Sequence, residues 1–314
     1  MEPAVVDDPW LDRAVATARA QFLSGKPFDR LDVALLVRQP DGTWRRGSFG
    51  PDALAYPASC VKLPFLVAAV HCCRLNGHPC DFLDDCVGPM VRNSDNVQTG
   101  VVVDTITGTT NLPDLTDPAD PRLAPWLAAR RYAERLLAEH GLLAGQTLLH
   151  KTYPTNSGEM PVGAEKVART VCGMNRMSPR AASSLMLQIV CGAIEPAARG
   201  YMLGLLDHDP RGGASVLGFG LPPGTRYHNK PGQAYDTLED IAYAVLPSGH
   251  ELIVAAFSNA FCKPYSEYPP PHHCSQLGPF METLLQTTGL AGGKPPVATA
   301  AAAPASGRPA PGKR

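Results

Sequence analysis

The sequence lacks an excess of charge of either sign. Its 28 Lys and Arg residues and 29 Asp and Glu residues leave a formal net charge of −1, and charged residues make up 18% of the 314 positions. A chain without a strong positive field has no electrostatic means of collecting nucleic acid or an anionic membrane. We therefore expect a small-molecule substrate and neither a nucleic-acid nor a membrane partner.

The sequence also lacks the basic segment and apolar run that a secretory signal requires. Asp7, Asp8 and Asp12 stand where such a signal is hydrophobic. No uninterrupted apolar run approaches the roughly 18 residues that a membrane span needs. These absences predict a cytoplasmic protein, or a secreted one only if a leader has been removed.

Paired Cys-x-x-Cys motifs are absent as well. Five of the nine cysteines crowd into residues 60–86, and the total is odd. An oxidising compartment would favour mispairing, so we expect reduced thiols. Cys80, Cys86, His71 and His78 are close in sequence, but their spacing does not match a zinc site. We expect no metal and no cofactor.

Hydrophobic periodicity and turn residues divide the chain into a mixed start, a helical middle and a mixed end. Hairpins are expected around Asp41-Gly42 and around Pro247-Ser248-Gly249. The predicted helices share an apolar side at helical spacing and cover residues 9–24, 58–75, 90–106, 123–140, 178–194, 197–206 and 276–288.

This order predicts an α+β fold, in which an α/β sandwich adjoins an all-helical subdomain. One antiparallel sheet is built from both chain ends. Residues 1–290 form a single domain, with 9–58 and 216–290 in the α/β subdomain and 59–215 in the helical subdomain. A ligand cleft is expected where the two meet. The Pro/Ala-rich segment 291–314 is predicted to be a disordered tail.

The first candidate constellation is Ser59-Cys60-Val61-Lys62, at the start of a strongly apolar helix. A serine hydroxyl becomes a good nucleophile when a base accepts its proton. Residues three apart share one helical face, so Lys62 can reach the oxygen of Ser59. Burial and neighbouring positive charge can lower the lysine pKa enough for this role. Taken alone, the tetrapeptide equally fits a helix cap followed by a surface lysine.

Two triplets follow at longer spacing. Ser94-Asp95-Asn96 can simply cap the next helix, since all three residue types are good caps. Lys230-Pro231-Gly232 precedes a β-rich run and can simply form a turn. Each triplet alone is ambiguous, and only their combination with Ser59 and Lys62 is informative.

In this order and these settings, the three motifs resemble the Ser-x-x-Lys, Ser-Asp-Asn and Lys-Thr-Gly signatures of the serine β-lactamase and penicillin-binding protein superfamily. The resemblance is to class A β-lactamases in particular, and it implies their fold and serine hydrolase chemistry. It spans about residues 10–288 and is thinnest over 107–177. The longer segments that carry it are YPASCVKLPFLVAAV, NRMSPRAASSLMLQIV and DIAYAVLPSGHELIVAAFSN.

The resemblance implies a role for each motif residue. Ser59 attacks a carbonyl and becomes acylated, Lys62 accepts its proton, and Ser94 passes a proton toward the leaving nitrogen. The implied substrate-binding residues are Asn96, Lys230 and Gly232. The implied oxyanion hole consists of the backbone N–H groups of Ser59 and Gln233.

The sequence departs from the family pattern in two places. Pro231 replaces the Thr or Ser whose hydroxyl helps to hold a substrate carboxylate, although an edge strand tolerates proline. The segment before residue 178 lacks the Glu-x-x-x-Asn pattern of the class A deacylation base. Glu159 and Glu165 are the candidates for that base, and the alternative is that both are surface carboxylates.

The sequence therefore predicts a serine hydrolase that acts on an amide or ester through a Ser59 acyl-enzyme, with β-lactams as the default substrate class. A cytosolic biosynthetic acyltransferase is one alternative. A module that binds an acyl group without turnover, or a pseudoenzyme, is another. The family default is a monomer.

Overall fold

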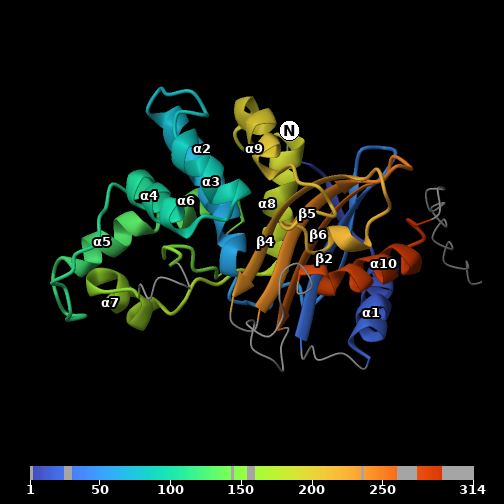
Figure 1. Ribbon diagram of the computed structural model, residues 1–314, viewed down its shortest axis with the longest axis horizontal. Coiled ribbons are helices and arrows are strands. Elements are labelled where there is room, and N and C mark those ends of the chain that lie inside the picture. Colours follow the sequence, from blue (N-terminus) through green and yellow to red (C-terminus); the bar gives the residue numbers. More distant parts are fainter. Residues whose placement is uncertain are drawn as a thin grey trace, which may run out of the picture.

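A central sheet with helices on both faces, and a group of further helices beside it, make up the computed structural model (Figure 1). The structure describes residues 3–24, 30–142, 145–153, 160–234, 237–259 and 274–291.

The sheet joins the two ends of the chain. Its strand order is β1-β3-β2-β6-β5-β4, so strand β2, near the start, lies beside strand β6, near the end. All pairs are antiparallel except β1 with β3, which is parallel. The strands are β1 (Val5–Asp7), β2 (Arg30–Arg38), β3 (Trp44–Phe49), β4 (Arg226–Ala234), β5 (Thr237–Val245) and β6 (Glu251–Asn259). The predicted α+β fold, with one sheet built from both ends, is confirmed.

Two helices from opposite ends of the chain cover one face of the sheet. Helix α1 (Pro9–Leu23) packs on β3 and on helix α10 (Gly278–Thr287). Helix α1 begins where the Asp8 carboxylate accepts a hydrogen bond from the backbone N–H of Trp10 and proline occupies the first helical position. Their apolar sides share one core, in which the rings of Phe22 and Phe280 meet edge to face.

Helix α8 (Pro179–Cys191) packs on the opposite face of the sheet, against β2, β5 and β6. The predicted cap at Ser178 is present, since its hydroxyl accepts a hydrogen bond from the N–H of Ala181 at 3.3 Å. Helix α8 falls within the range 59–215 that was assigned to the helical subdomain, yet it supports the sheet. It thereby links the two parts of the molecule.

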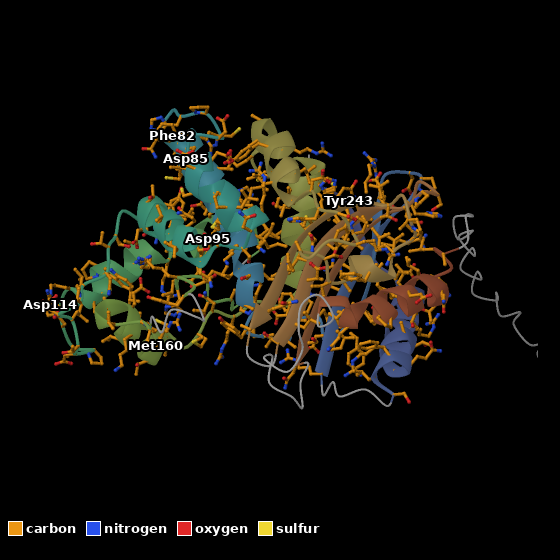
Figure 2. All side chains as sticks on the ribbon, in the orientation of Figure 1. Phe82, Asp85, Asp95, Asp114, Met160 and Tyr243 are labelled. Atoms are coloured by element: carbon orange, nitrogen blue, oxygen red, sulfur yellow. The ribbon has the colours of Figure 1, made fainter. Side chains whose placement is uncertain are left out.

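The remaining helices lie together beside the sheet (Figure 1). They are α2 (Lys62–Leu75), α3 (Asp84–Arg92), α4 (Asn96–Thr107), α5 (Leu123–Arg130), α6 (Tyr132–Glu139), α7 (Gly163–Cys172) and α9 (Arg199–Leu206). The labelled Asp114 and Met160 mark the end of this group that is far from the sheet, whereas Asp95 lies on the side toward it (Figure 2).

Helix α2 and the short 3₁₀ turn before it, Ala58–Val61, form the centre of the helical group. Together they make an 18-residue stretch with a mean hydropathy of 1.4, long and apolar enough to span a membrane, and 72% of it is buried inside the fold. The sequence analysis did not count this stretch because Lys62 and Arg74 interrupt it. We interpret it as a core helix, since its side chains pack against α3, α4 and α6.

Two predicted helices are each divided in the structure. The range 90–106 is interrupted at Ser94, which has a positive φ of 56°, and α4 restarts with the Asp95 carboxylate accepting from the N–H of Gln98. The range 123–140 is interrupted at Arg131. Neither β1 nor α7 was predicted, because each is short. The predicted tail lies outside the described residues from position 292 onward.

Candidate active site

A cleft of about 420 Å³ lies where the helical group meets strand β4. One wall is the turn that carries Ser59, together with the connection between α3 and α4. Residues 213–216 and the segment Lys230–Gln233 of β4 complete it. The cleft therefore gathers all three sequence motifs, which are separated by up to 171 positions along the chain between Ser59 and Lys230.

The nucleophile candidate Ser59 sits in the 3₁₀ turn that precedes α2. Ala58, directly before it, has a positive φ of 41°, a conformation that non-glycine residues rarely adopt. The next residue, Cys60, is fully buried, and its thiol donates a hydrogen bond to the carbonyl oxygen of Lys230 at 3.1 Å. This contact ties the turn of Ser59 to the strand that carries the third motif.

Lys62 is completely buried, and its Nζ lies 3.0 Å from Ser59 Oγ. It also lies 2.5 Å from the Ser94 carbonyl oxygen, 3.2 Å from Ser94 Oγ and 2.7 Å from Asn96 Oδ1. Burial, and secondarily the charge of Lys230, lower the pKa of Lys62 well below its ordinary value. The amine therefore sits in an environment that favours its neutral form.

Ser94 lies between the two lysines of the motifs. Its Oγ is 3.2 Å from the Nζ of Lys62 and 3.1 Å from the Nζ of Lys230. The positive φ of Ser94 lets its carbonyl and its hydroxyl face the same amine. Backbone strain of this kind is common where the surrounding structure holds a functional group in place.

Lys230 is also buried, with 1% of its surface exposed. Its ammonium donates to Ser94 Oγ and to the carbonyl oxygen of Pro231, both at 3.1 Å. Burial lowers the pKa of Lys230 to about 8, while Cys60 and Asp240 oppose that shift. Lys230 thus stays largely protonated at neutral pH, whereas Lys62 is the more strongly depressed of the two.

Asn96 uses both ends of its amide inside the protein. Its Oδ1 accepts a hydrogen bond from Lys62, and its Nδ2 donates to the carbonyl oxygen of Tyr153 at 2.9 Å. The side chain lines the cleft, and it also holds Lys62 in position from the side opposite β4.

Gly232 is required by close packing between β4 and the turn of Ser59. A Cβ at this position would lie 2.7 Å from the carbonyl oxygen of Pro57 and 3.0 Å from the Sγ of Cys60, closer than real Cβ contacts allow. The neighbouring Gln233 lines the cleft, as does Ser59. The oxyanion hole that these two backbones would form stays a prediction.

Comparison with known families gives a clear result. The model of the "Beta-lactamase enzyme family" matches residues 82–269, which is more than half of the chain and includes the second and third motifs. The chain belongs to this β-lactamase family. The family is one of serine hydrolases, as the sequence predicted.

One curated relative of this family member is Golvesin from Dictyostelium discoideum, which is 33% identical over 290 residues. The alignment covers 90% of this chain and 49% of Golvesin. The chain therefore spans about half the length of the curated relative that it matches.

Solved structures share the β-lactamase fold at low sequence identity. A β-lactamase from Sphaerobacter thermophilus has a TM-score of 0.59 and 19% identity, and the match covers 88% of this chain and 98% of that one. PBP-A in its acyl-enzyme complex with penicillin G has a TM-score of 0.61 and 18% identity, covering 92% and 99%. The TLA-1 extended-spectrum β-lactamase has a TM-score of 0.63 and 12% identity, covering 88% and 98%. These likenesses confirm the predicted fold.

The two glutamates proposed for deacylation in this β-lactamase-family chain have different outcomes. Glu159 lies outside the described residues. Glu165 is fully buried on α7, where its Oε1 accepts from the guanidinium of Arg130 at 2.6 Å. The same guanidinium reaches Asp104 at 2.6 Å, and Asp104 also pairs with Lys151. Glu165 is neither a surface carboxylate nor among the residues that line the cleft.

The described residues contain no group of three or more His, Cys, Asp or Glu side chains placed to hold a metal ion. The four residues weighed for zinc have other contacts in two cases. His71 pairs with Glu195 at 2.6 Å, and the Cys86 thiol donates to the carbonyl oxygen of Leu83 at 3.2 Å.

Sequence reasoning missed three residues that shape the site. The partner of Asn96 is a backbone carbonyl, that of Tyr153, and no side-chain pattern signals it. Cys60 was treated as a packing cysteine, although its place directly after Ser59 was a usable signal. Arg92, two positions before Ser94, lines the cleft and was not considered.

Proposed function

We propose that this chain is a serine hydrolase that attacks an amide or ester carbonyl through Ser59 and forms an acyl-enzyme. The observation that carries the proposal is the contact of 3.0 Å between Ser59 Oγ and the buried amine of Lys62. A nucleophile within hydrogen-bond reach of a base that is itself held by further groups is the arrangement that covalent catalysis requires.

The contacts of Lys62 support its assignment as the base. A neutral amine has two N–H bonds and one lone pair. The two shortest contacts of its Nζ are to the Ser94 carbonyl and Asn96 Oδ1, which can only accept hydrogen bonds. Both N–H bonds are thereby used, and the lone pair is left for the hydroxyl hydrogen of Ser59. As the Ser59 oxygen bonds to the substrate carbonyl carbon, its proton passes to Lys62.

The same geometry supports a route for that proton to the leaving group. Ser94 Oγ lies 3.2 Å from Lys62 Nζ, so it can accept the proton from Lys62 while it gives its own to the leaving nitrogen or oxygen. The C–N or C–O bond of the substrate then breaks. Lys230, which donates to Ser94 Oγ from the other side, stabilises negative charge on that oxygen during the transfer.

We propose a small-molecule amide or ester as substrate, with β-lactams as the default class. Support comes from the cleft volume of about 420 Å³ and from the acyl-enzyme that PBP-A forms with penicillin G. Monomeric state and cytoplasmic location stay predictions.

An acyltransferase, or a module that becomes acylated without turnover, is a second candidate that one observation favours. Among the residues described along the cleft there is no Asp or Glu. Release of the acyl group by water needs a general base, typically worth about 10²- to 10⁴-fold in rate. The acyl-enzyme is therefore expected to be long-lived unless an amine or alcohol acceptor removes the acyl group.

The test is incubation of the protein with a chromogenic cephalosporin and, separately, with an activated aryl ester. Product release and intact protein mass are followed together. The proposal predicts an adduct on Ser59 and its loss in Ser59→Ala. Sustained turnover supports hydrolysis by water, and a single burst with a stable adduct supports the acyltransferase or the non-turnover module. Full turnover by Ser59→Ala would overturn the proposal.

A further inference from the structure

The part of the cleft where this fold offers positive charge from strand β4 is already occupied by internal contacts. The ammonium of Lys230 is 1% exposed and donates to Ser94 Oγ and to the carbonyl of Pro231. Pro231 itself offers neither a hydroxyl nor an N–H. An anionic group on a substrate therefore finds little that can bind it directly on this strand.

The opposite wall carries an exposed cation. Arg92 is the last residue of α3, and its exposed side chain lines the cleft two residues before Ser94. Arg92 and Lys230 are the only charged side chains among the described residues that line the cleft, and no carboxylate lines it there. The accessible part of this cleft therefore has one sign of charge, and Arg92 supplies it.

Local packing leaves the guanidinium of Arg92 available. Within the described ranges, Arg92 takes part in no ion pair, and the carboxylate of Asp84 on the same helix accepts a hydrogen bond from the hydroxyl of Tyr201 at 2.8 Å. Gly88, one turn before Arg92, leaves the guanidinium room to move. A Cβ at Gly88 would lie 3.0 Å from Arg92 Nη1 and 3.2 Å from Asp84 Oδ1.

We propose that Arg92 is the specificity-determining residue that binds an anionic group, a carboxylate in the first instance, on the substrate acylating Ser59. The inference rests on the proposed function and adds to it the wall of the cleft that recognises charge. A planar guanidinium suits this task because it can donate two parallel hydrogen bonds to a carboxylate. Recognition thereby moves from strand β4 to the end of helix α3.

The test uses substrates that differ only in charge. One pair is a chromogenic cephalosporin and its carboxylate methyl ester, and the other is an activated aryl ester with a carboxylate and its carboxamide analogue. Acylation of Ser59 is followed by intact mass and by chromophore release for the wild type, Arg92→Gln and Arg92→Lys. Arg135→Gln is the matched control, since Arg135 is exposed on α6 and does not line the cleft.

Loss of a hydrogen-bonded charge partner predicts a fall of about 10- to 100-fold in kcat/KM for the anionic member of each pair in Arg92→Gln. The neutral members change little, Arg92→Lys keeps part of the preference, and the preference weakens as salt is added. Arg135→Gln behaves as the wild type.

Two failures have different signatures. If Ser59 is acylated but both members of each pair respond equally to Arg92→Gln, the assignment of Arg92 is overturned and the proposed function stands. If none of the four compounds acylates Ser59 in the wild type, the proposed function falls, and the assignment of Arg92 falls with it.

Discussion

Two buried groups of charged residues in this molecule are built in opposite ways. In the cleft, Lys62 and Lys230 are buried on either side of the Ser94 hydroxyl, and their printed partners are hydroxyl, carbonyl and amide oxygens. In the helical group, the buried Arg130 is held between the carboxylates of Asp104 and Glu165.

The difference separates a reactive site from a structural one. A buried amine without a carboxylate partner is pushed toward its neutral form, as the lowered pKa of Lys62 shows. Arg130 is paired with two carboxylates, and a guanidinium does not give up its proton in proteins. Burial raises the pKa of Glu165, but Arg130 and Lys151 oppose that shift. Strong perturbation of a titratable group beside a nucleophile marks the cleft, and charge balance marks the helical network.

Replacement of Lys62 is the change with the largest expected effect. Lys62→Met removes the proposed base and should slow acylation of Ser59 by about 10²- to 10⁴-fold. Because the unfolded chain holds Lys62 protonated and the fold favours the neutral amine, this lysine lowers stability at pH 7, by an amount that declines as the pH approaches 10.5.

Lys62→Met should therefore be at least as stable as the wild type at pH 7, with the advantage shrinking at higher pH. Stopped-flow acylation and urea unfolding at several pH values measure the two effects. A variant that acylates normally would remove Lys62 from the mechanism.

The second effect concerns the helical network. Arg130→Met leaves Glu165 buried without its main partner and should cost about 3–5 kcal/mol in the free energy of unfolding. The double variant Arg130→Met/Glu165→Leu should recover much of that loss, since Asp104 keeps its pair with Lys151. Urea denaturation of both proteins makes the comparison.

Glu165→Gln is the discriminating control for this network. If it folds, becomes acylated normally and yet loses turnover, Glu165 takes part in deacylation and the contrast between the two groups is wrong.

Close packing at Gly232 gives the third effect. Gly232→Ala forces the turn of Ser59 away from β4 and should cost about 1–3 kcal/mol, shared between stability and acylation rate. Gly249→Ala tests glycine replacement elsewhere, since the space around its Cβ is empty although its φ is +86°. Thermal unfolding and acylation kinetics are compared for both. Unchanged acylation in Gly232→Ala would show that the strand and the turn move independently.

The pH dependence gives the smallest effect. Acylation needs Lys62 neutral, so its rate should rise with pH through the lowered pKa of Lys62. It also needs Lys230 protonated, so the rate should fall, up to about tenfold per pH unit, above the pKa of Lys230 near 8. The pH profile of kcat/KM measures both limbs. Lys230→Arg should remove the alkaline limb, because arginine stays protonated there.

The motif residues could be predicted because their chemistry is local or carried by a familiar pattern. The spacing of Ser59 and Lys62 places them on one face of a turn, and the structure brings their reactive atoms to 3.0 Å. The sheet could be predicted because its strands are apolar and bounded by turn residues. The divided helix at Ser94 could not, since a positive φ there depends on tertiary contacts with Lys62.

Partners that meet through backbone atoms escaped the sequence altogether. The carbonyls of Tyr153 and Lys230 accept hydrogen bonds from Asn96 and Cys60, and every residue has such a carbonyl. The burial of Glu165 against Arg130 was also hidden, because the 35 positions between them fold back only in three dimensions. Long-range pairing of this kind depends on the fold rather than on local propensity.

Strand β4 is the outer strand of the sheet at the end where β5 is its sole neighbour in the described structure. An open edge of this kind can act as a template on which a second chain adds a strand and starts aggregation. Pro231, near the middle of the exposed segment, interrupts the row of donors that such an added strand would need. The same substitution that alters the cleft thus also guards the sheet against unwanted association.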